Sequence, residues 1–467
     1  ERDYAYAGSF YAYTIWIGLG VLGIVDLLNR KMKLNQAVAG GLATVICLAA
    51  VPGIMAKEGW DDHNRSNRYT ALDFAKMYLD SCDDNAVLFT NGDNDTFPLW
   101  YAQEVEGYRT DVRVINLSLL NTDWYIEQMS RAAYDSEPTP FTLKSHQYRQ
   151  GTRDYIPVID RNKEERYVDV KKVVQFFSDD KNQASMGNNR KMNYSPTKMY
   201  SLAVDSAKVV ANGTVPPEKA GEVLSEIKWK VGKNYLLKKD LLMLDLLAHF
   251  NWDRPIYFAI TTGNDAYIGL QGHFQLEGLT YRLVPFKGTS PDGQTGYVNA
   301  DKMYNNLMNK FSYGNVKEDG VYVDHNILRM CMNLRNNFAR CADAMLQRNQ
   351  TDKAVELLDK AVLEMPNHKV PFNYFMLPIM ELYFKSGNSE KAEAIAKVMV
   401  DRYESELDYY LSVKSQYYKK MGNTPQQSIS IIYQVSNLLT RYNPNGELAK
   451  QTTEVFSRLE KEFSIKS

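Results

Sequence analysis

The sequence predicts a membrane α-helical segment of two helices, then an extracytoplasmic α/β domain with a parallel βαβ unit, then all-α, tetratricopeptide-like helical repeats. Two apolar runs of about 20 residues near the N-terminus indicate the membrane helices. Alternating strand-like and helix-like segments after them indicate the α/β domain. Short motifs recurring with periods near 34 residues indicate the repeats. We therefore expect three parts, at 1–60, 61–332 and 333–467.

Composition and charge limit the kinds of protein that this chain can be. The 467 residues carry 55 basic and 56 acidic side chains, and this balance argues against a nucleic-acid-binding surface. The mean hydropathy of -0.42 restricts any membrane part to a short region. The four cysteines form no CxxC pair, so no zinc or redox motif is visible. The sequence also contains no P-loop and no GxGxxG, and we predict neither a metal site nor a cofactor. Because the chain begins with Glu1 rather than Met, we expect a fragment, a processed form or a trimmed chain.

The two apolar runs span about 10–28 and 37–56, each long enough to cross a bilayer. The loop between them, 29–33, carries three positive charges. Positive loops stay in the cytoplasm, so the chain from about residue 57 onward is expected outside it. Two buried helices of a soluble core are the alternative interpretation.

Periodicity and strand-forming residues define the expected elements of the α/β domain. A helix, a strand, a helix, a strand and the start of another helix are expected at 66–81, 86–90, 98–105, 111–116 and from 123. This order predicts a parallel βαβ unit. An insertion at about 135–235, with a short helix at 168–177, precedes a helix at 236–250 and strands at 255–260 and 280–284.

The C-terminal part contains recurring short motifs. Residues 354–366 resemble the second helix of a tetratricopeptide repeat, closed by a proline. The motif at 351–354 recurs at 389–392, and that at 387–389 recurs at 422–424. Such periods are typical of stacked helical hairpins. An ordinary helical bundle is the alternative.

Polar residues follow the first two strands of the predicted unit. Because the carboxyl ends of parallel strands line the crevice where ligands bind, two groups of carboxylates and amides should converge there. The candidate ligand-binding residues are Asp93, Asn94, Asp95, Asn116, Asn121 and Asp123, with Trp124. An aromatic face beside hydrogen-bonding amides suits a sugar ring. Helix caps and strand ends are the alternative for the same residues.

A second candidate motif stands before the strand at 255–260. It consists of Trp252, Asp253 and Arg254. These residues either take part in ligand binding or form a simple Asp253–Arg254 pair.

Three stretches resemble one protein family. They are the membrane-interface motif Glu1, Arg2, Asp3 and Tyr4, the run Thr-Asn-Gly-Asp-Asn-Asp-Thr-Phe-Pro-Leu-Trp-Tyr at 90–101, and Asn-Leu-Ser-Leu-Leu-Asn-Thr-Asp-Trp-Tyr at 116–125. They resemble the C-terminal half of large bacterial multi-pass membrane proteins, long of unknown function. That family is related to the animal transmembrane O-mannosyltransferase of plexin-type receptor domains, and the resemblance covers essentially the whole chain.

The resemblance implies a glycosyltransferase of the cell inner membrane, with residues from about 57 onward in the periplasm. Its implied partners are membrane lipid, a polyprenyl-phosphate-linked sugar and exported acceptor proteins. The family's presumed catalytic carboxylate lies in an early external loop of an N-terminal half that is absent here. We therefore expect no catalytic residue in this chain, which would handle acceptor or lipid-linked sugar and be inactive alone. The alternative is a membrane-anchored envelope scaffold whose helical repeats bind partner proteins.

Overall fold

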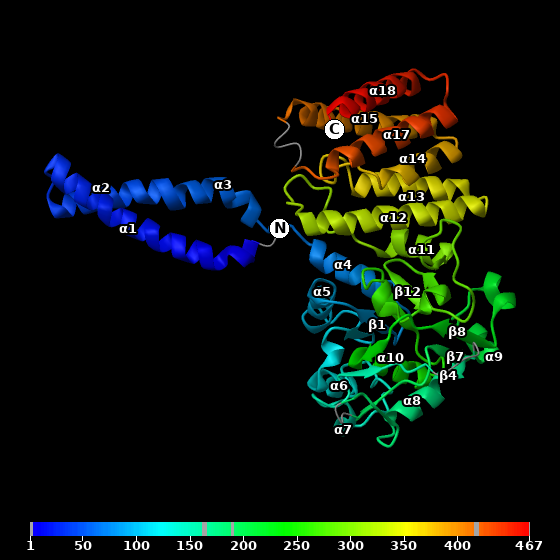
Figure 1. The fold of residues 1–467 in the computed structure, drawn as a ribbon. Helices are drawn as coiled ribbons and strands as arrows, with labels where there is room; N and C mark the ends of the chain where they lie inside the picture. Colours follow the sequence, from blue (N-terminus) through cyan, green and yellow to red (C-terminus); the bar gives the residue numbers. More distant parts are fainter. Residues whose placement is uncertain (1–2, 161–165, 188–190, 415–419, 467) are drawn as a thin grey trace. The chain divides into compact units, whose positions relative to one another are not determined.

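A computed structural model describes residues 3–160, 166–187, 191–414 and 420–466 (Figure 1). The chain divides into two compact units. The first contains Glu1–Asn67 with Asp319–Tyr322, and the second contains Arg68–Glu318 with Val323–Ser467. The α/β part and the C-terminal helices thus belong to one compact unit.

The first unit contains two candidate membrane-spanning helices. Helix α1 covers Ala7–Met32; α2 covers Gln36–Leu48 and continues through a π-helical turn into α3, Ile54–His63. The turn contains Pro52, whose missing N–H prevents a regular helical bond at that point. The segments Tyr4–Met32 and Gln36–Trp60 are long and apolar enough to cross a membrane, in agreement with the prediction.

The N-terminal interface motif is only partly visible. Glu1 and Arg2 lie outside the described residues. Asp3 begins a short 3-10 turn that ends at Tyr6, and the Tyr4 side chain is exposed. The predicted interface role of these four residues stays a prediction.

The second unit is built on a mixed six-stranded sheet in the order β13-β11-β12-β10-β1-β2. Its strands are β1 Val87–Thr90, β2 Arg113–Asn116, β10 Ile256–Ala259, β11 Phe274–Leu276, β12 Thr280–Leu283 and β13 Tyr297–Val298. Strands β2, β1 and β10 are parallel, and β12 is antiparallel to β10. All residues of β1, β2 and β10 are buried, as expected for strands covered on both faces.

Helices cover both faces of this sheet. Helices α4, Thr70–Asp80, and α5, Asp93–Glu104, belong to the core on one face. Helices α6, Asp123–Met129, and α10, Lys238–His249, belong to the core on the other face. The predicted parallel βαβ unit is therefore present as β1, α5 and β2.

Helix α5 begins at Asp93, not at Pro98 as the sequence prediction had it. Gly92 precedes it with φ 88°, a left-handed conformation that glycine adopts without strain. Thr96 donates a hydrogen bond to the Gly92 carbonyl at 2.7 Å, which closes the first turn. Asp93 and Asp95 in this turn face the positive end of the helix dipole. The acidic cluster is thus helical rather than part of a loop.

The predicted insertion forms small sheets of its own. Helix α8, Val170–Ser178, confirms the short helix expected at 168–177. The other elements are α7 Ser145–Tyr148, β3 Tyr155–Pro157, β4 Val168–Asp169, β5 Gln183–Ser185, β6 Lys191–Asn193, β7 Met199–Ala203, α9 Ser206–Ala211, β8 Glu226–Lys230 and β9 Tyr235–Leu237. Strands β4, β7 and β8 form a three-stranded sheet. These strands have two to five residues and lack the continuous burial of β1, β2 and β10, so no apolar run marked them in the sequence.

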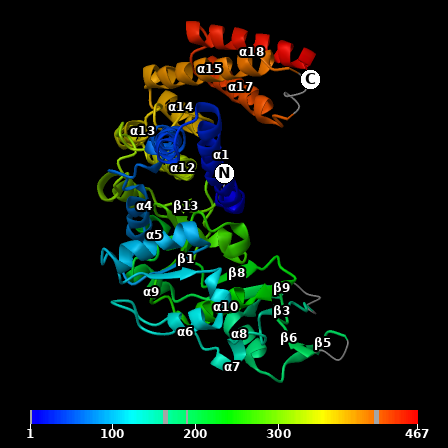
Figure 2. The ribbon, with the colours of Figure 1, turned by 90° about the vertical axis from the view of Figure 1, so that its left-hand side faces the viewer.

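The C-terminal part is helical (Figures 1 and 2). A short α11, Ala300–Asn305, precedes α12 His325–Gln347, α13 Thr351–Glu364, α14 Met376–Lys385, α15 Ser389–Ser412, α17 Thr424–Tyr442 and α18 Glu447–Lys466. The recurring sequence motifs coincide with the first residues of α13, α15 and α17. Recurrence therefore marks helix beginnings, and the repeat type stays a prediction.

Candidate binding site at the edge of the sheet

The polar residues after β1 and β2 meet, as the sequence predicts. Asn116 at the end of β2 is fully buried. Its Nδ2 donates to the Gly92 carbonyl at 3.3 Å and to Thr96 Oγ1 at 2.9 Å. Its Oδ1 accepts from the N–H groups of Ser118 at 2.8 Å and Leu119 at 3.1 Å. The whole amide is therefore engaged in joining the two loops.

The neighbouring amides have similar roles. Asn91 Oδ1 accepts from Ser118 Oγ at 3.1 Å, which adds a second bond between the loops. Asn121 Oδ1 accepts from the Lys239 N–H at 3.1 Å, and its Nδ2 donates to the Leu117 carbonyl at 3.3 Å. Asn121 thus holds the segment after β2 against the first turn of α10.

The acidic cluster divides into an exposed and an inward-facing part. Asp93 and Asn94 are exposed, whereas Asp95 is half-buried and accepts a hydrogen bond from Thr261 Oγ1 at 2.7 Å. Burial raises the pKa of Asp95, and the Thr261 bond opposes that rise. Within the described ranges, no three His, Cys, Asp or Glu residues are grouped so as to hold a metal ion. Ligand binding by the cluster stays a prediction.

The other predicted residues have separate structural roles. Asp123 begins α6, where its Oδ1 accepts from the Trp124 N–H at 2.9 Å. Trp252 is buried, and its indole N–H donates to the Ala203 carbonyl at 3.0 Å. Asp253 pairs with Lys208 at 2.5 Å, not with Arg254. The pair considered from sequence is not formed because Asp253 stays at the surface while Arg254 is buried.

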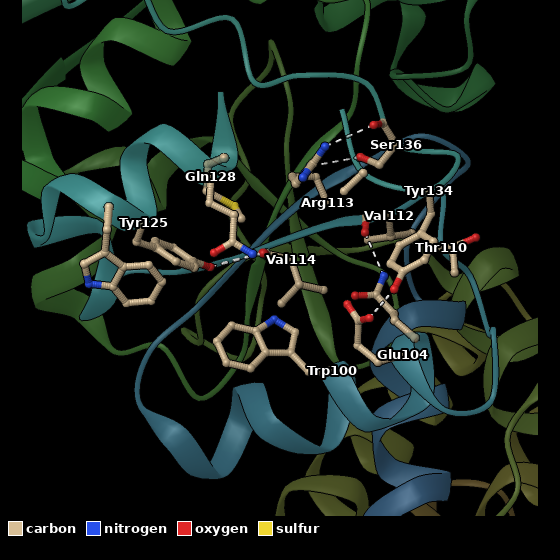
Figure 3. Close-up of a pocket in the computed structure, with 14 residues that line it drawn as sticks. Trp100, Glu104, Thr110, Val112, Arg113, Val114, Tyr125, Gln128, Tyr134 and Ser136 are labelled. Atoms are coloured by element: carbon tan, nitrogen blue, oxygen red, sulfur yellow. Dashed lines mark hydrogen bonds between the residues drawn. The ribbon is translucent and has the colours of Figure 1, made fainter. Parts of the chain in front are cut away.

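A pocket of about 260 Å³ lies beside the outer edge of β2, between α5 and α6. Figure 3 shows Trp100, Tyr125 and Gln128 gathered around Val114 of β2. Trp124 also lines it. The Tyr125 ring contacts both indoles, with centroids 6.4 Å from Trp100 and 5.5 Å from Trp124. The cavity is thus displaced from the strand ends to the side of the last strand.

Side chains cap the outer edge of β2. Gln103 Nε2 donates to the Val112 carbonyl at 2.8 Å. The Tyr125 hydroxyl accepts from the Asn116 N–H at 2.9 Å and donates to the Val114 carbonyl at 3.4 Å. An edge strand protected in this way is a poor template for another strand.

Two buried arginines hold the far wall of the pocket, the loop 131–138. Arg113 Nη2 donates to the carbonyls of Arg131, Ser136 and Glu137 at 2.9, 3.0 and 3.1 Å. Arg254 Nη1 donates to the carbonyls of Glu137 and Pro138 at 3.1 and 3.3 Å. Burial, assisted by the nearby charge of Arg113, lowers the pKa of Arg254 to about 10. Arg254, singled out from sequence, therefore supports the pocket without lining it.

Sequence reasoning found Trp124 but missed most of the pocket. Gln103, Arg113 and Gln128 come from three different elements and form no recognisable motif. The one signal for the pocket in the sequence was that Trp100 and Trp124 lie within a few residues of the polar clusters after the first two strands.

The fold and the site define a protein with two candidate membrane-spanning helices and an α/β domain that carries an aromatic pocket. Residues 71–302 match the family model named TMEM260-associated domain 2. This match is consistent with a TMEM260-related family. Comparison with curated proteins and with solved structures gave no match.

Proposed function

We propose that the chain is the C-terminal portion of an integral membrane glycosyltransferase that takes its sugar from a lipid carrier outside the cytoplasm. The observation that carries this proposal is a TMEM260-associated domain at 71–302 that directly follows two apolar helices. The motif resemblance to relatives of a protein O-mannosyltransferase adds the reaction class. Acceptors would be Ser or Thr side chains of exported proteins.

This chain would contribute acceptor or lipid-linked-sugar handling rather than bond breaking. The resemblance assigns the catalytic carboxylate to a segment outside this sequence. Asp93 and Asp95 are the residues proposed to contact a ligand, because they lie where the loops after β1 and β2 meet. The catalytic N-terminal half and this domain would act together on one membrane surface.

The orientation belongs to the same proposal, with the loop 29–33 in the cytoplasm and the large domain in the periplasm. Cysteine labelling in intact cells tests it, with Cys47 replaced by serine. The other cysteines, Cys82, Cys331 and Cys341, are buried, which suppresses their labelling. A membrane-impermeant maleimide should label D62C and leave N29C unlabelled. The reverse pattern would contradict the orientation.

The activity is tested with the full-length membrane protein in its own cells. Deleting the gene should remove hexose from Ser and Thr of exported proteins, measured by mass spectrometry of periplasmic peptides. Re-expression of the full-length protein should restore it. Unchanged glycosylation after deletion would reject the transferase and leave the scaffold, with α12 to α18 as its partner-binding part.

The double variant Asp93→Asn, Asp95→Asn tests the role of the acidic cluster. Asparagine keeps the size and hydrogen-bonding capacity of aspartate, so the fold should be kept. A loss of about 2 kcal/mol in transition-state or acceptor binding would lower kcat/KM roughly thirtyfold. Full activity in a stably folded double variant would remove the cluster from ligand binding.

A further inference from the structure

The pocket beside β2 combines two indole rings whose packing leaves ring surface available. Trp100 stacks on Phe97, with centroids 5.5 Å apart and an interplanar angle of 26°. Trp124 meets Tyr125 edge to face at 76°, and 55% of Trp124 is exposed. An apolar C–H face of a pyranose ring packs well on such an aromatic surface, which combines large contact area with a polar N–H at its rim.

Hydrogen-bonding groups of both kinds surround these rings. Among the described residues, none bonds to the indole N–H of Trp100 or of Trp124, or to the side-chain amide of Gln128. The Val114 N–H faces outward from the edge strand β2, because Arg113 and Leu117 donate on the opposite side, to the carbonyls of Ala86 and Thr90. The pocket thus offers several donors.

Acceptors are present as well. Glu104 accepts from the Tyr134 hydroxyl through Oε2, and its Oε1 receives no hydrogen bond from any residue that the structure describes. Figure 3 shows Glu104 and Tyr134 on one side of the pocket, with Gln128 on the other. Hydroxyl groups both donate and accept, so a polyol satisfies such a mixed lining.

Charge and backbone geometry narrow the choice of ligand. The pocket is lined by one carboxylate, Glu104, and one guanidinium, Arg113. Their charges cancel, so the net charge of the lining favours neither an anionic nor a cationic ligand. Arg113 is already occupied by the wall loop. An extended peptide would need the edge groups of β2, and Gln103 and Tyr125 occupy most of these.

We propose that this pocket is a non-catalytic binding site for one neutral pyranose ring. Trp124 and Trp100 supply the stacking surface, and Gln128 and Glu104 contact the hydroxyl groups. This inference does not rest on the transferase activity, because binding of a free sugar requires no transfer. It also differs from the acidic cluster at the start of α5, which lies at the strand ends.

The test uses residues 1–467 of the chain in lipid nanodiscs. Sugar-headed detergents are avoided because their headgroups would compete. Methyl α-D-mannopyranoside, methyl β-D-galactopyranoside and D-glucuronate are the probes, followed by calorimetry and saturation-transfer NMR. At least one methyl glycoside should bind with a Kd on the order of 1 mM, as expected for a small ligand in an open site.

Two exposed residues provide variants that keep the fold. Trp124→Ala should weaken binding of the methyl glycoside at least tenfold, and Gln128→Ala severalfold. Tyr409→Ala, at a similarly exposed aromatic on α15, is the matched control and should bind as the wild type does. Thermal denaturation of all three should match the unmodified chain.

Three results would overturn the proposal. They are no binding of either methyl glycoside up to about 50 mM, binding that both pocket variants leave unchanged, and tenfold tighter binding of D-glucuronate, which would indicate an anion site at Arg113. Sugar binding in a protein whose gene deletion leaves glycosylation intact would support the pocket and reject the transferase. The two proposals therefore fail separately.

Discussion

The carboxyl ends of β1 and β2 and the outer edge of β2 are adjoining polar regions that use their hydrogen-bonding groups in opposite ways. At the strand ends, the amides of Asn116 and Asn121 bond to backbone groups of the protein itself. At the edge, the described structure leaves the indole of Trp100 and the amide of Gln128 without internal partners. Residue type alone marks both regions as polar. Whether a polar group is free for a ligand depends on its neighbours.

This difference has an energetic meaning. Removing the partner of a buried, hydrogen-bonded polar group lowers the free energy of unfolding, so such a pair contributes to the stability of the fold. An unpaired group at a pocket costs little in the free protein because water solvates it, and it becomes useful when a ligand arrives. Substitutions at the strand ends should therefore change stability, and substitutions at the edge should change binding.

The largest effect is expected for Asn116→Ala. The variant leaves the N–H groups of Ser118 and Leu119 without their acceptor and removes one of the two donors to the Gly92 carbonyl, the other being Thr96. The free energy of unfolding should fall by about 3 kcal/mol. Hydrogen exchange of the β1 and β2 amides would measure it. Asn94→Ala, at a nearby exposed asparagine, should stay within about 0.5 kcal/mol of the wild type. Equal losses of stability in Asn116→Ala and Asn94→Ala would contradict the structural role assigned to the strand-end amides.

Two buried arginines allow an effect on the shape of the pocket to be distinguished from an effect on stability alone. Arg254 holds the pocket wall, whereas Arg335 on α12 donates to the carbonyls of Met365 and Val370 at 2.8 and 2.5 Å, in the helical part. Replacing either by lysine removes the planar fork and should cost about 2 kcal/mol of stability. Only Arg254→Lys should also weaken methyl glycoside binding. Calorimetry of both variants checks this, and parallel losses of binding would show that the wall has no specific role.

Asp95 provides a smaller, pH-dependent effect. Burial raises its pKa, so the folded protein keeps this proton at a pH where the unfolded chain has lost it. Its stabilising contribution is complete below the unfolded pKa, near 3.8, and is lost as the pH rises through the folded pKa. Asp95→Asn removes this dependence. The stability of the variant relative to the wild type should therefore increase between acidic and neutral pH.

Thermal denaturation of both proteins across that pH range measures the effect. A constant difference at all pH values would mean that Asp95 titrates as an ordinary exposed carboxyl. In that case the inward-facing part of the acidic cluster would be no different from its exposed part.

The smallest effect is expected for Asp93→Ala. Asp93 is exposed in the first turn of α5, so its contribution is the interaction of its charge with the helix dipole. We expect a loss of about 0.5 kcal/mol that diminishes in high salt. Urea denaturation at low and high ionic strength is the measurement. A loss several times larger would indicate a structural bond at Asp93 and would place it with Asn116.

The sequence by itself determined the elements whose pattern is local. The apolar runs of α1 and α2, the buried strands β1, β2 and β10, and helices α8 and α10 were all predicted within a few residues. The helices are long enough for hydrophobic periodicity to be visible, and the three strands, although only four residues long, are marked by continuous burial. The convergence of the loops after β1 and β2 followed from the rule for parallel strands.

Only the tertiary structure decided which polar residues are free. Asn116 and Gln128 are both amides, yet one is completely enclosed by its hydrogen-bond partners and the other faces a pocket. The start of α5 at Asp93, the Lys208–Asp253 pair and the role of Arg254 likewise depend on contacts between residues far apart in the chain. Hydrogen-bond satisfaction is a property of three-dimensional neighbours, so residue type and spacing could propose the site's chemistry but not its location.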